Sequence, residues 1–93
     1  MILYNSIITM NNKHRKTFKR LMTKPILANI RFDDVDKLLI KMGYERLERE
    51  GSRVAYGIGD DEIVIHKPHP NNEIKKYVIK KLQDFIKTTE TRL

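Results

Sequence analysis

The 93-residue chain contains no cysteine, so it has no disulfide framework, no thiolate nucleophile and no cysteine-ligated zinc site. No apolar run approaches the roughly 18 residues that a membrane-spanning helix requires. Residues 1–10 are mildly apolar, but they lack the basic segment and the small-residue cleavage site of a signal peptide. These absences predict a cytoplasmic protein with no membrane partner.

Acidic residues are absent from the first 32 positions, which hold seven lysines or arginines. Residues 33–50 hold six acids and four bases, the C-terminal part is again cationic, and the net charge is +7. This excess of positive charge attracts nucleic acid, anionic lipid or an acidic protein partner, and charge alone does not distinguish among these partners. The apolar content of 40% and its periodicity indicate one small folded domain.

We interpret residues 1–29 as a tail followed by a basic helical arm. The sequence at Met10 resembles a second translation start, so residues 1–9 are either an over-long N-terminus or a loose tail. A weak apolar stripe that includes His14 predicts a helix over residues 13–22, and Lys24-Pro25 ends it. The arm can grip an RNA backbone, dock on an acidic partner or pack on a second subunit, and the sequence does not separate these roles.

Two helices and three strands are expected after the arm. Asp33 is expected to cap a helix that Gly43 ends, and a change to alternating residues then predicts strands at 44–50, 53–58 and 63–65, joined by turns at 51–52 and 59–61. A last helix is expected to begin near Asn72, with a cationic stripe opposite its apolar face formed by Lys76, Lys80, Gln83 and Lys87. Two helices on one face of a three-stranded antiparallel sheet bury both apolar surfaces, which gives an α+β fold of order α-β-β-β-α.

The segment from His66 to Lys76 concentrates the chemistry. Two imidazoles follow an apolar strand, and Lys75 and Lys76 precede a helix. An imidazole exchanges protons near neutral pH, and cations at a helix start favour a phosphate. The alternative for His66 and His69 is that both are ordinary surface residues at a strand exit that prolines stiffen.

The helix–sheet–helix order, the Glu50-Gly51-Ser52 turn and the run from Pro68 to Lys76 together resemble the HicA family of toxins. The resemblance covers residues 30–88, with residues 89–93 left as a C-terminal tail. It implies a double-stranded-RNA-binding-domain-like fold and a metal-independent endoribonuclease that acts on mRNA and is neutralised by a HicB-like antitoxin. No cofactor is implied.

The resemblance also assigns site residues. Family members typically have Gly-Ser-His at the start of the second strand, with that histidine catalytic, whereas this chain has Arg53 there. An arginine is a permanent cation with no accessible proton. His69 matches a family histidine, and His66 is an additional imidazole, so we expect both to transfer protons while Arg53 stabilises the phosphorane. The expected RNA contacts are Ser52, Lys67, Lys75 and Lys76.

Several alternatives remain open at this stage. Arg53 can instead pair across the strands with Glu48 or Glu50, and the lysines can be solvated surface residues. If Arg53 abolished catalysis, the protein is an RNA-binding or partner-binding module of the same fold. Tyr44, Tyr56 and Tyr77 are expected in the core. No metal site is expected, because the histidines are few and Asp60, Asp61 and Glu62 are consecutive residues whose side chains diverge.

Overall fold

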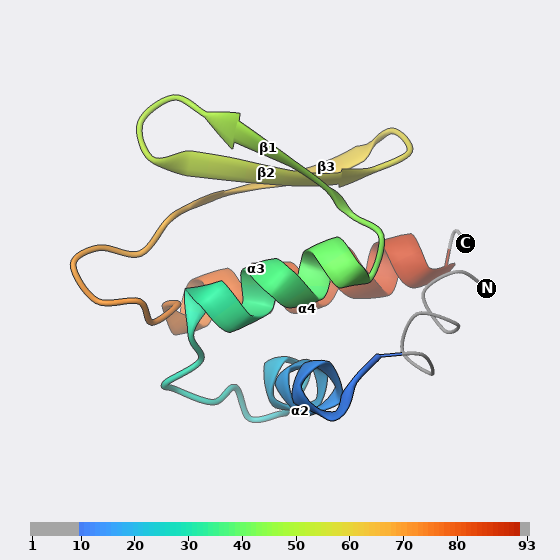
Figure 1. Cartoon of the computed structure of the whole chain (residues 1–93), viewed down its shortest axis with the longest axis vertical. Coiled ribbons are helices and arrows are strands. Elements are labelled where there is room, and N and C mark those ends of the chain that lie inside the picture. Colours follow the sequence, from blue (N-terminus) through green and yellow to red (C-terminus); the bar gives the residue numbers. More distant parts are fainter. Residues whose placement is uncertain (1–9, 92–93) are drawn as a thin grey trace.

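Three layers of secondary structure stack on one another in the computed structural model, which describes residues 10–91 (Figure 1). The expectations for residues 1–9 lie outside this range. The elements are α2 (Asn12–Leu21), α3 (Phe32–Lys41), β1 (Glu45–Arg49), β2 (Arg53–Ile58), β3 (Asp61–His66) and α4 (Lys76–Thr91). The strands form one antiparallel sheet of order β1-β2-β3, with α3 and α4 on one of its faces. The predicted α+β arrangement is confirmed.

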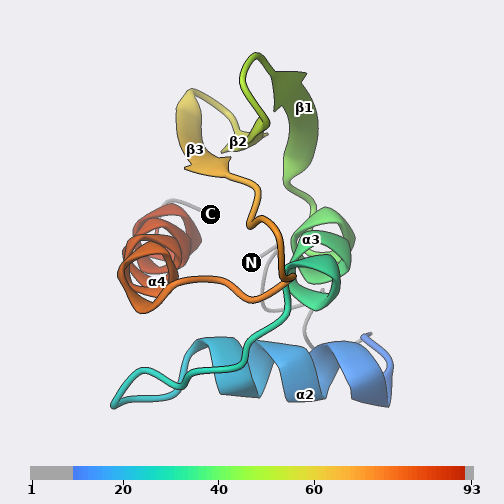
Figure 2. The ribbon, with the colours of Figure 1, turned by 90° about the vertical axis from the view of Figure 1, so that its left-hand side faces the viewer.

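The basic helix α2 forms the third layer. Figure 2 shows it running beneath α3 and α4, on the side of these helices that faces away from the sheet. Leu21 is fully buried, whereas the lysines and arginines of α2 are exposed. None of the helices within residues 10–91 is long and apolar enough to cross a membrane.

The register of the sheet separates a core face from an outer face. Val54 pairs with Ile65 on the side of the helices, and both side chains are buried. Arg53 pairs with His66 on the opposite side, and both are exposed. His66 and Val64 therefore lie on one face of β3, as the alternation of side chains along a strand requires.

The start of α3 differs from the expectation. The helix begins at Phe32, with Arg31 rather than Asp33 at the N-cap, and the Arg31 side chain makes no capping hydrogen bond. The backbone N–H of Phe32 instead donates to the carbonyl oxygen of Asn72 at 2.7 Å. A contact from a distant loop therefore replaces the local cap. The predicted end is confirmed, since Gly43 has a φ of +103° immediately after the helix, where glycine carries no Cβ penalty.

The start of α4 is also later than predicted. Residues 72–74 do not enter the helix, because the N–H of Ile74 donates to the carbonyl oxygen of Ile30 at 2.8 Å and Arg31 forms an antiparallel bridge with Glu73. The helix begins at Lys76 and continues to Thr91, past the boundary at residue 88 that the sequence suggested.

Gln83 was wrongly placed on the exposed cationic side of the last helix. Its side chain is fully buried, and its Nε2 donates to the carbonyl oxygens of Leu21 at 2.9 Å and Thr23 at 3.2 Å. These carbonyls end α2, so Gln83 joins the C-terminus of α2 to α4. Gln83 follows Ile79 by four residues, a spacing that puts two side chains on one helix face.

Replacement of Gln83 by methionine, which has a similar length, should therefore destabilise the protein. The Leu21 carbonyl oxygen would lose its donor in a buried place and the Thr23 carbonyl oxygen in a partly buried one, which typically costs about 1–3 kcal/mol. The free energy of unfolding is measured by urea denaturation. The exposed Lys37→Met variant on α3 is the control, and it should change stability by no more than about 0.5 kcal/mol. Equal stabilities of the two variants would contradict a structural role for Gln83.

Candidate functional site

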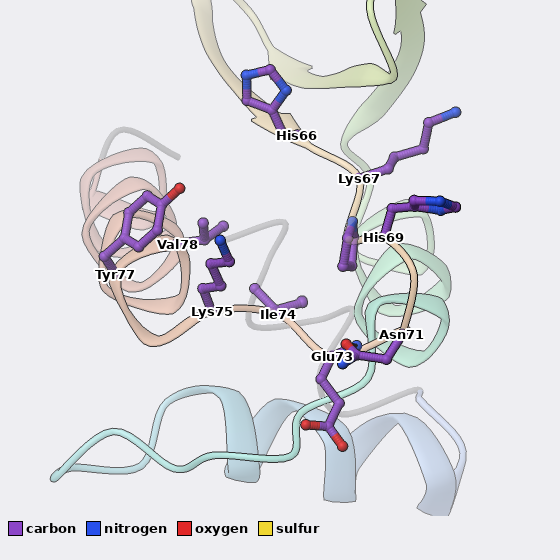
Figure 3. Close-up of a pocket in the computed structure, with 10 residues that line it drawn as sticks. His66, Lys67, His69, Asn71, Glu73, Ile74, Lys75, Tyr77 and Val78 are labelled. Atoms are coloured by element: carbon purple, nitrogen blue, oxygen red, sulfur yellow. Dashed lines mark hydrogen bonds between the residues drawn. The ribbon is translucent and has the colours of Figure 1, made fainter.

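A hollow of about 470 Å³ lies where the chain leaves β3 and enters α4 (Figure 3). It is lined by His66, Lys67, Pro68, His69, Asn71, Glu73, Ile74, Lys75, Tyr77 and Val78. Four of the residues predicted for the site thus share one hollow: His66, Lys67, His69 and Lys75. The loop and the helix start that carry them are fixed by the backbone pairing of residues 72–74 with residues 30–32.

Arg53 joins the site through the register of the sheet. It stands opposite His66 on the neighbouring strand, and directly opposed residues of an antiparallel pair have Cβ atoms about 4.5–5.5 Å apart. The Nε–H of Arg53 donates to the backbone carbonyl oxygen of Glu50 at 2.9 Å, which holds the guanidinium beside the β1–β2 turn. A fixed cation and an imidazole therefore lie side by side on the outer face. The alternative in which Arg53 pairs with Glu48 is wrong, because Glu48 lies on the inner face, opposite Val54.

His69 has a different orientation from His66. Its ring points away from His66, and the Lys67 side chain extends in the same direction as the His69 ring (Figure 3). The described part of the chain thus brings the two imidazoles to one hollow without pointing them at each other. His69 is exposed and stands in the loop between β3 and α4, so rotation of its side chain is not blocked by a packed core.

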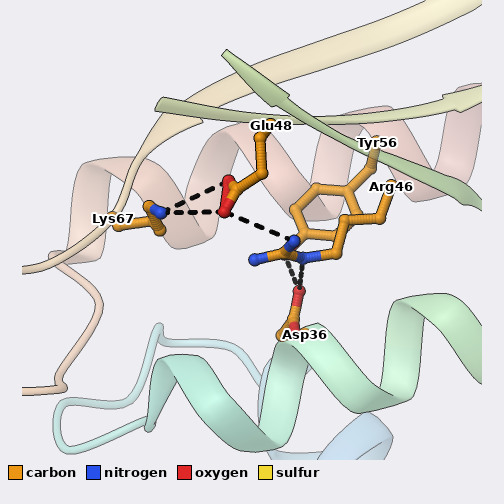
Figure 4. Close-up of polar contacts among 5 residues, drawn as sticks. All are labelled: Asp36, Arg46, Glu48, Tyr56 and Lys67. Atoms are coloured by element: carbon orange, nitrogen blue, oxygen red, sulfur yellow. Dashed lines mark hydrogen bonds and ion pairs between the residues drawn. The ribbon is translucent and has the colours of Figure 1, made fainter. Parts of the chain in front are cut away.

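Lys67 is held by a chain of polar contacts that reaches into the protein (Figure 4). Its Nζ donates to both carboxylate oxygens of Glu48, at 3.1 and 3.3 Å. The Oε1 of Glu48 is also 3.6 Å from the Nη1 of the Arg46 guanidinium, and the Nε of Arg46 donates to Asp36 at 2.7 Å. Asp36 additionally accepts a hydrogen bond from the Tyr56 hydroxyl. The side chains of β1, β2 and α3 thereby fix where the Lys67 ammonium lies.

The same contacts shift protonation equilibria in the directions expected for such a chain. The hydrogen bond from Lys67 lowers the pKa of the Glu48 carboxyl below its ordinary value, with a further contribution from the Arg46 charge. Burial, followed by the hydrogen bond to the Asp36 carboxylate, raises the pKa of Tyr56. The hydrogen bond to Asp36 raises the pKa of Arg46. All three shifts keep the charged contacts intact near neutral pH.

The remaining predicted residues occupy three different positions. Ser52 is an exposed turn residue with a φ of +61°, and its carbonyl oxygen accepts from the N–H of Lys67 at 2.8 Å. Lys75 lines the hollow, and its side chain points toward the His66 side. Lys76 is the exposed first residue of α4 and does not line the hollow.

Tyr77 was assigned to the core, and this assignment is wrong. Its side chain is 61% exposed and lines the hollow, and the Lys81 ammonium lies 5.8 Å from the centre of its ring. Tyr77 precedes the buried Ile79 by two residues, which corresponds to about 200° around a helix, so helical spacing already separates it from the core. An exposed aromatic ring beside cations provides a surface on which a base can stack.

The described residues contain no group of three or more His, Asp or Glu side chains arranged to hold a metal ion.

Comparison with known families identifies the class of protein. The family model for the HicA toxin of bacterial toxin–antitoxin systems matches residues 32–90, which include α3, the sheet and most of α4. The chain therefore belongs to the HicA toxin family, and this membership implies an antitoxin as its partner. Neither curated proteins nor solved structures give a significant match. The helix α2 and the connector that follows it precede the matched region.

The contact between Lys67 and Glu48 can be tested by titration. Lys67→Met should raise the pKa of Glu48 toward its ordinary value, because the hydrogen bond from Lys67 is the main cause of the lowering. The pKa is measured by NMR from the carboxyl carbon as a function of pH. Lys80→Met is the control, since Lys80 pairs with Asp84 on α4 at 3.1 Å, and it should leave the pKa of Glu48 unchanged. An unchanged value in Lys67→Met would mean that the contact is absent in solution.

Proposed function

We propose that the protein is an mRNA interferase, a hydrolase of the cytoplasm that binds mRNA and cleaves it as a metal-independent endoribonuclease, and that a HicB-like antitoxin neutralises it. The observation that supports this function is the hollow, which carries two imidazoles and two lysines, with Arg53 opposite His66 on the neighbouring strand. Proton carriers and fixed cations are the groups that cleavage of a phosphodiester by a neighbouring 2′-hydroxyl requires.

The reaction divides into a proton removal, a displacement and a proton delivery. One imidazole takes the proton of the 2′-hydroxyl, and the 2′-oxygen then forms a bond to the adjacent phosphorus. The bond from phosphorus to the 5′-oxygen breaks, and a protonated imidazole supplies a proton to that leaving oxygen. We assign these two roles to His66 and His69.

The cations stabilise the negative charge that develops on the phosphate during the displacement. Arg53 lies opposite His66 on β2 and is positioned to stabilise the phosphorane next to that imidazole. Lys75, at the start of α4, contacts a phosphate from the other wall of the hollow, and Tyr77 stacks on a base. Lys67 adds a further phosphate contact once its ammonium leaves Glu48. The proposed RNA contacts also include Ser52, whose carbonyl oxygen accepts from the N–H of Lys67, and Lys76, which follows Lys75.

Cleavage of a long single-stranded RNA in the presence of EDTA tests the proposal. The wild-type protein should cut the RNA, and His66→Ala and His69→Ala should each lower the rate by about 10²–10⁴-fold, which is the usual contribution of one acid–base group. Cleavage sites and rates are followed by primer extension and gel electrophoresis. The chain provides a matched control in His14, a partly buried histidine on α2 that does not line the hollow.

His14→Ala should cut at the wild-type rate. If all three alanine variants cut equally fast, the nuclease is a contaminant or the site is elsewhere. If cutting requires a divalent metal ion, the acid–base mechanism is wrong even where the hollow is the site.

A second candidate function is a catalytically weakened or inactive module that binds RNA or a partner. The observation in its favour is Arg53 itself, whose Nε is engaged by the main chain of Glu50 and which has no proton to exchange at neutral pH. The cations and Tyr77 would still hold RNA in such a protein.

Arg53→His distinguishes the two functions. If the protein is an endoribonuclease, the wild type should cut the RNA. Arg53→Ala should then cut it about 10²–10³-fold more slowly, because a group that stabilises the developing charge is lost. If the protein is a binding module, the wild type should bind RNA without cutting it, and Arg53→His should gain cleavage. Both variants are compared by the EDTA assay and by RNA affinity at a fixed salt concentration.

A further inference from the structure

A second hollow, of about 400 Å³, lies between α2 and the connector that leads to α3. Its cationic lining residues are Lys13, Lys16, Arg20 and Arg31, and its one carboxylate is that of Asp34. The positions of Lys13, Lys16 and Arg20 on α2 follow helical spacing, so these side chains share one face of the helix. The family match begins at residue 32, after all four of these cations.

Two of the four cations in this hollow already have partners. The Nζ of Lys13 is 3.8 Å from the Asp34 carboxylate. The Nη2 of Arg20 donates to the Asn29 carbonyl oxygen at a long 3.5 Å. Lys16 and Arg31 are exposed, and no side-chain hydrogen bond or ion pair joins either to another residue in the part of the chain that the structure describes. Asp34 offsets only part of the positive charge of the hollow, so Lys16 and Arg31 are available to an external anion.

The two hollows adjoin at one point of the backbone. Arg31, which lines the second hollow, forms an antiparallel bridge with Glu73, which lines the hollow beside His66. Hydrogen bonds of 2.7 and 2.8 Å on either side of this bridge fix the two walls relative to each other. The Glu73 side chain points toward α2 (Figure 3), so a carboxylate stands between the two cationic regions.

We propose that the second hollow is a phosphodiester-binding subsite, in which Lys16 and Arg31 contact the backbone of an RNA strand that extends from the hollow beside His66. This inference rests on the proposed function. A polyanion with a phosphate at every nucleotide fits two cationic hollows whose walls meet at the Arg31–Glu73 bridge, because its phosphates can contact the cations on either side of the Glu73 carboxylate. The subsite would raise the affinity for long RNA without adding sequence specificity, because phosphates carry no base information.

The test compares two double variants that remove equal charge. Lys16→Gln/Arg31→Gln alters the subsite, and Lys19→Gln/Lys37→Gln alters exposed cations of α2 and α3 that do not line the hollow. Binding of 2′-O-methyl RNA, which lacks the reacting hydroxyl, is measured by fluorescence anisotropy over a range of salt concentrations. A trinucleotide, followed by NMR chemical shifts, reports on the hollow beside His66 alone.

The subsite variant should bind the long RNA more weakly and should lower the slope of log affinity against log salt by about 1.4, which is about 0.7 for each of two lost phosphate contacts. The control variant should keep the wild-type slope, and both variants should bind the trinucleotide as the wild type does. Equal slopes in the two variants, or a loss of antitoxin binding with RNA binding intact, would overturn the subsite. If the wild type binds neither RNA, the proposed function fails as well, so the two failures are distinguishable.

Discussion

The pairing of residues 30–32 with residues 72–74 is the constraint on which both the fold and the site depend. Two backbone hydrogen bonds, from Ile74 to Ile30 and from Phe32 to Asn72, join segments that lie far apart in the sequence. They supply a partner for an N–H at the start of α3, where no side chain caps the helix, and they delay the start of α4. The loop that carries His69 is consequently anchored at its end, and the walls of both hollows are set by one piece of backbone.

A second constraint is electrostatic and connects the core to the surface. Asp36 on α3 accepts hydrogen bonds from Arg46 and Tyr56, and the Arg46 charge also attracts Glu48, which holds Lys67. Removal of a partner near Asp36 would leave a partly buried charge uncompensated, so these positions are restricted by stability as well as by function. On the proposed function, Lys67 reaches a phosphate only by leaving the Glu48 carboxylate. Of the lysines that line the hollow, Lys75 is therefore the more readily available cation.

The sequence predicted the features that depend on local pattern, and it missed those that depend on contacts between distant segments. The alternating pattern correctly predicted a strand at residues 53–58, and Gly43 correctly marked the end of α3. Asp33 is a good capping residue that the structure does not use, because a distant carbonyl at Asn72 occupies that role. Gln83 is polar, yet it is buried, and its Nε2 donates to the carbonyl oxygens at the end of α2. Neither partner could be identified from the residues around Asp33 or Gln83.

The site combines several cations with two imidazoles. Where the resemblance puts a catalytic imidazole, Arg53 adds a permanent positive charge next to His66 and removes one proton carrier. On the proposed subsite, the cations of α2, which lies outside the family match, add attraction for RNA without adding acid–base chemistry. On the proposed function, the cations that line the second hollow contribute to affinity, whereas His66 and His69 transfer the protons. If Lys16 and Arg31 form the proposed subsite, their substitution alters binding alone, whereas a change at Arg53 alters binding and chemistry together on the proposed function.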